Sequence, residues 1–227
     1  MRARRIKLVV FDLDGTLADT ARDLADSVNE LRHRFGLTKL SDSAVARHVG
    51  QGVGHLLSHT LPPAARAVHP DYPAAFSAIY RRRCVHRTRL FPGAAAALRR
   101  LKAEGYRLAV ATNKPGGLSR RILRRLGVLR LFGAVLGGDD VVRKKPHPEV
   151  MRTLMRRFHA KPSETVLVGD SRFDMDTGRR ARCRLVAVTW GFGSRRELLP
   201  WRPAAVISRC SALGPAIARL ALPRYSR

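Results

Sequence analysis

Two aspartates separated by one residue, Asp12 and Asp14, lie in the segment FDLDGT at residues 11–16. An apolar run precedes them and a glycine follows, so the chain can turn here and direct both carboxylates into one crevice. Crowded anions cost free energy unless a cation binds them or one of them keeps its proton. Carboxylate oxygens suit Mg²⁺, and a carboxylate held in this way can act as a covalent nucleophile. The segment therefore favours metal-assisted chemistry at Asp12 over a simple aspartate-rich turn.

Two other groups of polar residues also follow apolar runs. Thr112 and Asn113 close the run at residues 108–112, and Asp170 and Asp174 follow the run at residues 165–168. Considered alone, Thr112 and Asn113 could simply end a strand. Asp174 could stabilise the N-terminus of the next helix through the helix dipole, a role that is compatible with a chemical one.

The segments that must position these residues alternate between strand-like and helix-like patterns. Apolar runs predict strands at residues 8–11, 108–112, 165–168 and 185–188, and two shorter runs do so at 134–136 and 205–207. Between them, helices are predicted at residues 94–104, 118–126, 149–158 and 175–182. This alternation predicts an α/β fold with a doubly wound, Rossmann-like parallel sheet. Ligands of such sheets bind at the carboxyl ends of the strands, where all the polar groups above fall.

Residues 18–89 interrupt the alternation, because they show helical periodicity and no good strand. Helices are predicted at residues 20–35, 41–47, 52–61 and 74–83. A structureless loop of this length is improbable in a compact domain. We therefore expect a helical cap domain at residues 18–89, inserted into an α/β core domain formed by residues 1–17 and 90–227.

Basic residues outnumber acidic ones, 44 against 17, which gives a formal net charge of +27. Such a charge attracts nucleic acid, anionic lipid or anionic metabolites. Because the basic residues are spread over nearly every predicted helix and no RNA- or DNA-binding motif is present, we expect only nonspecific, salt-sensitive polyanion binding.

No apolar run approaches the roughly 20 residues that span a bilayer. The three cysteines lack a CxxC spacing, which indicates free thiols and a cytoplasmic protein.

The motifs and their order resemble those of the haloacid dehalogenase superfamily. The first motif is DLDGT at residues 12–16, and the second is Thr112-Asn113. The third is Lys145 within KKPHP at residues 144–148, and the fourth is GDSRFD at residues 169–174. Lys144 makes the register of the third motif ambiguous, but the superfamily places its lysine directly before the proline, which selects Lys145.

This resemblance implies a role for each matched residue. Asp12 would attack phosphorus to form an aspartyl-phosphate, and Asp14 would act as general acid and then as general base. Mg²⁺ would be bound by Asp12, Asp170 and the backbone carbonyl of Asp14, with Asp174 holding the waters of the metal. The phosphoryl oxygens would be bound by the remaining matched groups: Thr112, Asn113, Lys145 and the backbone near Leu13. Dehalogenating members lack an acid/base aspartate at the position of Asp14, so its presence favours phosphate chemistry.

Longer stretches resemble the phosphoglycolate phosphatase subfamily. They are DLDGTLADT at residues 12–20, GQGVG at 50–54, ATNKP at 111–115 and GGDD at 137–140. The implied function is hydrolysis of a small phosphorylated metabolite, 2-phosphoglycolate first of all. N-acetylmuramate 6-phosphate, pyrophosphate and other sugar phosphates remain alternatives, as does a sugar-phosphate mutase. A nucleic-acid-associated protein is the third alternative, and it rests on the charge alone.

Three positions need separate comment. Phe173 stands where relatives commonly carry a polar residue, and Arg182-Cys183 stands where they commonly carry a helix-ending glycine. Both departures leave the core chemistry intact and bear on the choice of substrate. His147 could serve as a base, but a loop histidine between two prolines is better interpreted as structural.

Overall fold

The computed structural model describes residues 6–221 and contains a six-stranded parallel sheet with strand order β5-β4-β1-β6-β7-β8. Its strands are β1 (Leu8–Phe11), β4 (Arg107–Ala111), β5 (Ala134–Leu136), β6 (Thr165–Gly169), β7 (Arg184–Val188) and β8 (Ala205–Ile207). All six predicted strands form, with ends that differ by at most one residue. The predicted doubly wound α/β fold is therefore confirmed.

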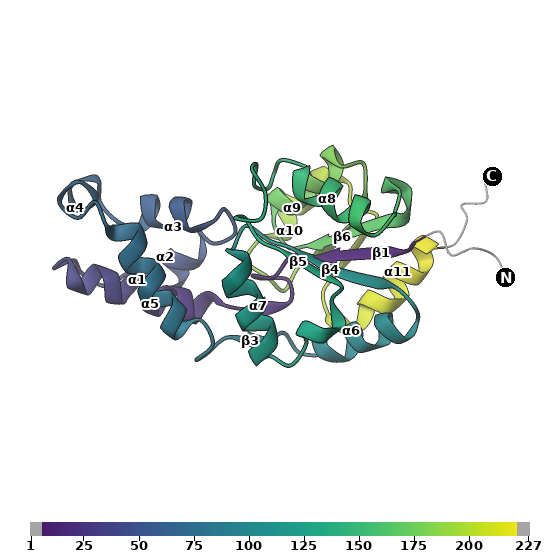
Figure 1. Ribbon diagram of the computed structural model, residues 1–227, viewed down its shortest axis with the longest axis horizontal. Coiled ribbons are helices and arrows are strands. Elements are labelled where there is room, and N and C mark those ends of the chain that lie inside the picture. Colours follow the sequence, from purple (N-terminus) through teal and green to yellow (C-terminus); the bar gives the residue numbers. More distant parts are fainter. Residues whose placement is uncertain (1–5, 222–227) are drawn as a thin grey trace.

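Helices cover both faces of this sheet (Figure 1). One face is covered by α6 (Ala94–Ala103), α7 (Gly116–Arg125) and α11 (Leu213–Ala221). The other is covered by α8 (Glu149–Arg157), α9 (Arg172–Arg180) and α10 (Arg195–Leu198). In the part of the chain that the structure describes, four short 3-10 helices complete the core: η1 (Leu129–Leu131), η2 (Pro162–Glu164), η3 (Leu199–Trp201) and η4 (Cys210–Ala212). Side chains of β1 alternate between the two apolar cores, because Val9 and Phe11 belong to one and Leu8 and Val10 to the other.

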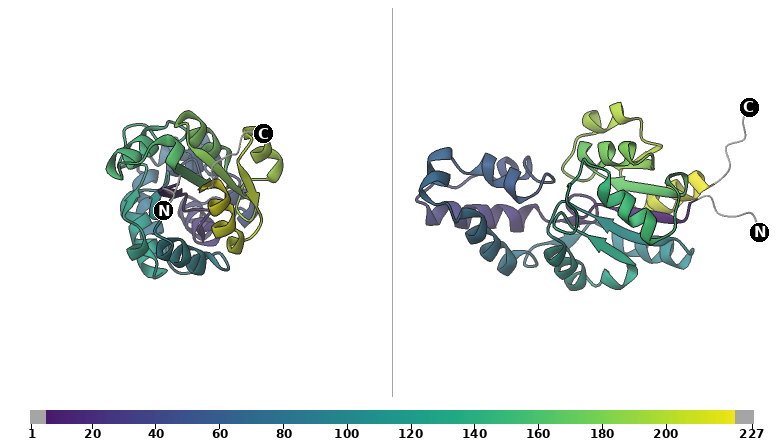
Figure 2. Two further views of the ribbon diagram at one scale, coloured as in Figure 1. Left: turned by 90° about the vertical axis from the view of Figure 1, so that its right-hand side faces the viewer. Right: turned by 45° about the horizontal axis from the view of Figure 1, so that its top comes forward.

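The remaining helices form a separate group beyond the carboxyl ends of the strands (Figures 1 and 2). They are α1 (Ala21–Arg34), α2 (Asp42–Ala46), α3 (Val53–Thr60), α4 (Pro63–Val68) and α5 (Tyr72–Arg83). The apolar stripe of α1 is buried in this group, where Leu24, Val28 and Leu31 pack with Phe76 and Ile79 of α5.

Two short strands connect the helical group to the core. β2 (Ala18–Asp19) pairs antiparallel with β3 (Arg89–Leu90), so the chain leaves and returns side by side. The prediction that residues 18–89 contain no strand is therefore wrong at both ends. A two-residue strand carries no alternation that a sequence pattern could reveal, since its pairing depends on a partner far away in the chain. Helix α4 was also missed, because six residues are too few to show helical periodicity.

Basic side chains gather in the last turns of several helices, where they oppose the negative end of the helix dipole. The last turns carry Arg81–Arg83 in α5, Arg124 and Arg125 in α7, Arg156 and Arg157 in α8, and Arg179 and Arg180 in α9. This distribution accounts for part of the charge by helix stabilisation. Within residues 6–221, no helix combines the length and the apolar composition needed to cross a bilayer.

Candidate active site

The order of the strands brings the predicted site residues to one edge of the sheet. β1 lies between β4 and β6. The strands β4 and β5 extend the sheet on one side of β1, and the later strands β6, β7 and β8 extend it on the other side. Asp12 follows β1, Thr112 follows β4, and Asp170 follows β6. Since all three strands are parallel, their carboxyl ends meet, and this is where open α/β sheets bind ligands.

Three buried carboxylates meet at this edge. We call Asp12, Asp170 and Asp174 the acid cluster; one carboxylate oxygen of each lies within 4.8 Å of the others. All three are at most 3% exposed. Lys145 contacts two of them, with its Nζ 2.8 Å from Oδ1 of Asp12 and 2.6 Å from Oδ1 of Asp174. The ambiguity between the two neighbouring lysines is resolved, because Lys144 is exposed whereas Lys145 is buried.

The electrostatics of the acid cluster favour a bound cation. Burial, reinforced by the Asp174 carboxylate, raises the pKa of Asp12 to about 8 even though Lys145 opposes the shift. Burial and Asp174 likewise raise the pKa of Asp170 to about 7. Among the described residues, no donor makes a hydrogen bond of good geometry to Oδ1 of Asp12, and Lys145 contacts it as an ion pair only. Three buried carboxylates with one lysine fit a divalent cation that prefers oxygen ligands.

Neighbouring groups fix the orientation of the Asp170 carboxylate. Thr16 Oγ1 donates to Oδ1 of Asp170 over 2.7 Å, and the Phe192 amide donates to Oδ2 over 2.8 Å. Gly15 has a φ of 81° and lies so close to Asp170 that a side chain at residue 15 would overlap its carboxylate. The glycine of the first motif is therefore required by the packing of the fourth motif against it.

Asp174 combines two roles that the sequence left open. Its Oδ2 accepts from the amide and the hydroxyl of Ser171, and its own amide donates to the Ser171 hydroxyl, forming a capping box at the start of α9. Its Oδ1 contacts Lys145 in the acid cluster. Asp174 therefore both stabilises the N-terminus of α9 and belongs to the acid cluster.

Asp14 lies outside the acid cluster and faces the helical group. Its Oδ1 accepts from Thr20 Oγ1 over 2.7 Å, and its Oδ2 lies 3.1 Å from Lys114 Nζ. Lys114 in turn donates to the hydroxyl of Tyr80 on α5 over 2.9 Å. Burial alone would lower the pKa of Lys114, but Asp14 and Tyr80 more than offset it, so its pKa is raised and the ammonium stays charged.

Sequence reasoning gave Lys114 and Tyr80 no role. Lys114 was visible as part of ATNKP, directly after the second motif, and a lysine between a strand end and a proline is the available signal. Tyr80 gave no signal, because a tyrosine in an amphipathic helix is ordinarily a core residue.

The second motif connects Lys145 to the helical group. Asn113 Nδ2 donates to the carbonyls of Gly50 and Lys145, over 3.0 and 3.1 Å, and its Oδ1 accepts from the Lys145 amide over 2.9 Å. Asn113 thus positions the segment that carries Lys145. The hydroxyl of Thr112 accepts from the Lys114 amide over 3.2 Å and lies buried at the end of β4. The side chain of Leu13 is fully buried, so only its backbone could face a ligand.

Two hollows meet at Asp12 and Asp14. One, of about 30 Å³, reaches between the second motif and α3, and Tyr80 and Lys114 line it. The other, of about 320 Å³, opens past Arg172 and Phe173 of α9 and past Arg47 and Gln51 of the helical group. Phe173, the departure noted in the fourth motif, therefore lies at the mouth of the site, where its ring is 4.9 Å from the Arg172 guanidinium.

The other residues singled out in the sequence are structural. His147 Nδ1 accepts from the Glu149 amide over 3.2 Å at the start of α8, so the structural interpretation agrees with its contacts. In the GGDD segment, Asp139 accepts from the Gly116 amide over 2.6 Å at the start of α7. At the end of α9, Arg182 adopts a φ of 58°, a left-handed conformation that glycine would favour.

Comparisons with known proteins identify relatives of this chain. The family model of haloacid dehalogenase-like hydrolases matches residues 9–188. A phosphoglycolate phosphatase of Yersinia pseudotuberculosis is 32% identical over 221 residues, which cover 96% of this chain and 95% of that protein. One from Cereibacter sphaeroides is 38% identical over 191 residues, covering 81% and 85%. The crystal structure of a predicted phosphoglycolate phosphatase from Haemophilus somnus superposes with a TM-score of 0.87 at 29% identity, covering 94% of this chain and 98% of that one.

Proposed function

This chain belongs to the haloacid dehalogenase-like hydrolases and is a phosphoric monoester hydrolase, and from this premise we propose that it hydrolyses 2-phosphoglycolate with the help of Mg²⁺. The observation that carries the proposal is the buried Asp12 carboxylate, which lies beside Lys145 and two further carboxylates at the floor of a hollow. Such a site combines a nucleophile with cations that neutralise a phosphoryl group.

In the first step Asp12 attacks phosphorus and the bond from phosphorus to the leaving oxygen breaks. Asp14 donates a proton to that oxygen, so the product leaves as an alcohol and Asp12 carries an aspartyl-phosphate. Lys145 stabilises the charge of the phosphoryl oxygens, as do Thr112 and the backbone near Leu13. The side chain of Asn113 instead acts by positioning Lys145, because its groups are bonded to Gly50 and to the Lys145 backbone. Asp14 must also exchange its contact with Lys114 for one with the leaving oxygen, because Lys114 and the leaving oxygen compete for the Asp14 carboxylate.

In the second step a water molecule attacks the phosphorus of the aspartyl-phosphate. Asp14, now ionised, takes a proton from that water, the acyl-phosphate bond breaks, and Asp12 is regenerated with release of inorganic phosphate. The Thr20 hydroxyl holds Asp14 in reach for both transfers, since it donates to the other carboxylate oxygen.

We assign Mg²⁺ to Asp12, Asp170 and the backbone carbonyl of Asp14, with Asp174 binding the waters of the ion. Bound there, the cation supplies positive charge to the phosphoryl oxygens and keeps Asp12 ionised. The raised pKa values of Asp12 and Asp170 support this assignment, because without a cation both carboxyl groups retain protons near neutral pH.

The size and the charge of the hollows support a small anionic substrate. The larger hollow has a volume of about 320 Å³, and its rim carries Arg47 and Arg172. A second anionic group beside the phosphate, such as the carboxylate of 2-phosphoglycolate, matches these cations better than the neutral hydroxyls of a hexose phosphate do. Relatives named phosphoglycolate phosphatase support the same choice.

We further propose that residues 18–89 act as a cap that opens and closes over the core formed by residues 1–17 and 90–227. The paired strands β2 and β3 support this proposal, because both connections pass through them. Closure would exclude water and bring Tyr80 to Lys114.

The three cysteines are free, which supports a reducing, cytoplasmic setting.

A substrate panel tests the proposal. The purified enzyme is assayed with Mg²⁺ for phosphate release from 2-phosphoglycolate, N-acetylmuramate 6-phosphate, pyrophosphate and hexose phosphates. We expect the highest kcat/KM with 2-phosphoglycolate. A higher value with another phosphate ester would contradict the substrate, and isomerised hexose phosphate without phosphate release would favour a mutase. Nucleic-acid binding that survives about 0.2 M salt would revive a polyanion role for the charge.

A further inference from the structure

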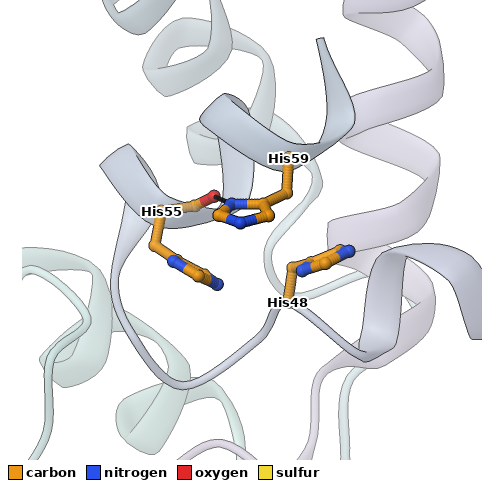
Figure 3. Close-up of side chains that lie close together, drawn as sticks. All are labelled: His48, His55 and His59. Carbon is orange, nitrogen blue, oxygen red and sulfur yellow. Dashed lines mark hydrogen bonds between the residues drawn. The ribbon is translucent and has the colours of Figure 1, made fainter.

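Three histidines of the helical group converge outside the acid cluster (Figure 3). His48 follows α2, while His55 and His59 lie one turn apart on α3. One ring nitrogen of each lies within 4.8 Å of the others. The ring centroids are 4.0 Å apart for His55 and His59, and 4.7 Å apart for His48 and His59. We call these three residues the imidazole cluster.

The chain builds this cluster locally. Spacing of four residues places His55 and His59 on the same face of α3. Gly50 and Gly52 adopt φ values of 104° and 91°, which side chains disfavour, and they turn the chain so that α3 returns beside His48. In Figure 3, His55 and His59 project from the same helix, and His48 projects from the segment below it.

The hydrogen bonding of the cluster resembles that of a metal-binding histidine. His59 Nδ1 lies 2.9 Å from the His55 carbonyl oxygen, so with Nδ1 protonated it donates to that oxygen and leaves Nε2 as an acceptor. Metal-ligating histidines ordinarily donate their other ring nitrogen to a carbonyl or carboxylate, which fixes the ring. Within residues 6–221, no ion pair joins any of the three rings to a carboxylate.

The rings can be reached by an ion from solvent. His48 and His55 are half-buried, and His59 is exposed.

We propose that His48, His55 and His59 bind a transition-metal ion, Zn²⁺ by the chemistry of the donors, with a fourth position open. Three imidazoles suit Zn²⁺ and leave a coordination position for water or another ligand. Mg²⁺ prefers oxygen donors, so the acid cluster and the imidazole cluster would select different ions.

The position of the cluster gives this ion a consequence for the active site. Residues 49–52 connect His48 to the helix that carries the other two histidines, so a bound ion ties both ends of this loop together. The loop lines both hollows at Asp12, and Gly50 accepts the hydrogen bond from Asn113. Zn²⁺ would therefore order the loop that contacts the substrate hollow.

Zinc titration of the metal-stripped, full-length protein tests the proposal, with saturating Mg²⁺ present to occupy the acid cluster. We expect one Zn²⁺ per chain by calorimetry in the wild type. The variants H48Q, H55Q and H59Q should each bind at least about tenfold more weakly, since even groups that only support a ligand change metal affinity by roughly 10–100-fold. The control H33Q alters an exposed histidine of α1 and should bind Zn²⁺ like the wild type.

Hydrogen exchange supplies a second readout. Amides of residues 49–52 should exchange more slowly with Zn²⁺ in the wild type and in H33Q, and should not respond in H55Q. Circular dichroism establishes that each variant is folded before its affinity is compared. Equal zinc affinity of the wild type and the triple variant H48Q/H55Q/H59Q would overturn the proposal, whatever the substrate of the enzyme proves to be. An unchanged exchange rate at residues 49–52 would overturn the link to the loop.

Discussion

The acid cluster and the imidazole cluster are built in opposite ways. The acid cluster joins Asp12 after β1 to Asp170 after β6 and Asp174 on α9, and its members are buried. The imidazole cluster draws all its members from residues 48–59 and lies near the surface of the helical group. Long-range packing is therefore needed to assemble the first, whereas one turn of chain assembles the second. Burial makes the first a strong electrostatic site, and exposure leaves the second free to gain or lose an ion.

The substitution D12N should have the largest effect on activity. Removal of the nucleophile is expected to lower kcat by at least about 10³-fold, as loss of a covalent nucleophile does in other enzymes. Phosphate release in single-turnover assays with Mg²⁺ measures it. The control D176N alters a carboxylate of α9 that pairs with Arg180 at the surface, and should retain near wild-type activity. Activity of D12N within tenfold of the wild type would show that the acid cluster is not the reaction centre.

The substitution K145M should have the next largest effect, a fall in kcat of roughly 10²–10³-fold, because one preorganised cation for the phosphoryl group is lost. K144M is a matched control, since the two lysines are neighbours in sequence and Lys144 is exposed. Steady-state kinetics with the preferred phosphate ester compare the two variants. Equal losses in both would place the phosphate-binding lysine elsewhere and weaken the contrast between buried and exposed sites.

The stability of the metal-free protein should fall as pH rises from about 4 to 8, by on the order of a few kcal/mol. The folded-state pKa values of Asp12 and Asp170, about 8 and about 7, exceed the value near 3.9 of an unfolded chain. Between these values the folded state holds more protons than the unfolded state, so stability is lost with rising pH and levels off above about 8.

Urea denaturation with a chelator across this pH range measures the slope. Mg²⁺ should flatten it, because the cation takes the place of the protons. The double variant D12N/D170N lacks both carboxyl groups, so its slope measures the contribution of all the other titrating groups. A wild-type slope equal to that of the double variant would show that burial does not perturb these carboxyls.

The substitution Y80F should have the smallest effect, a change in kcat/KM of a few fold, which corresponds to about 1 kcal/mol for one hydrogen bond. Tyr80 donates no charge and contacts Lys114 rather than the acid cluster. Loss of its hydroxyl should affect the helical group and Asp14 and should leave Mg²⁺ affinity unchanged. A large loss of Mg²⁺ affinity in Y80F would show that the acid cluster depends on the helical group.

Sequence reasoning recovered most of the core because its strands are apolar runs that need both faces buried, a pattern visible without a partner. It singled out Asp12 and Asp170 because they stand in motifs at strand ends, and Lys145 because it stands in a motif directly before a proline; the structure brings Lys145 to both Asp12 and Asp174. It missed β2 and β3, whose pairing exists only between distant residues. It also passed over the imidazole cluster, although the spacing of His55 and His59 on a predicted helix was a usable signal; only the position of His48 was hidden.

The sequence by itself determined the six strands of the main sheet, most of the helices and the candidate groups for chemistry, since these depend on local pattern and composition. The tertiary structure alone decided which groups meet. Asp14 contacts Lys114, which in turn contacts Tyr80, instead of joining the other carboxylates, and Asn113 links Lys145 to the loop at Gly50. The physical reason is that the charge state of each group depends on its burial and on its distance from other groups. For residues far apart in the chain, both arise only when the parallel strands align their carboxyl ends.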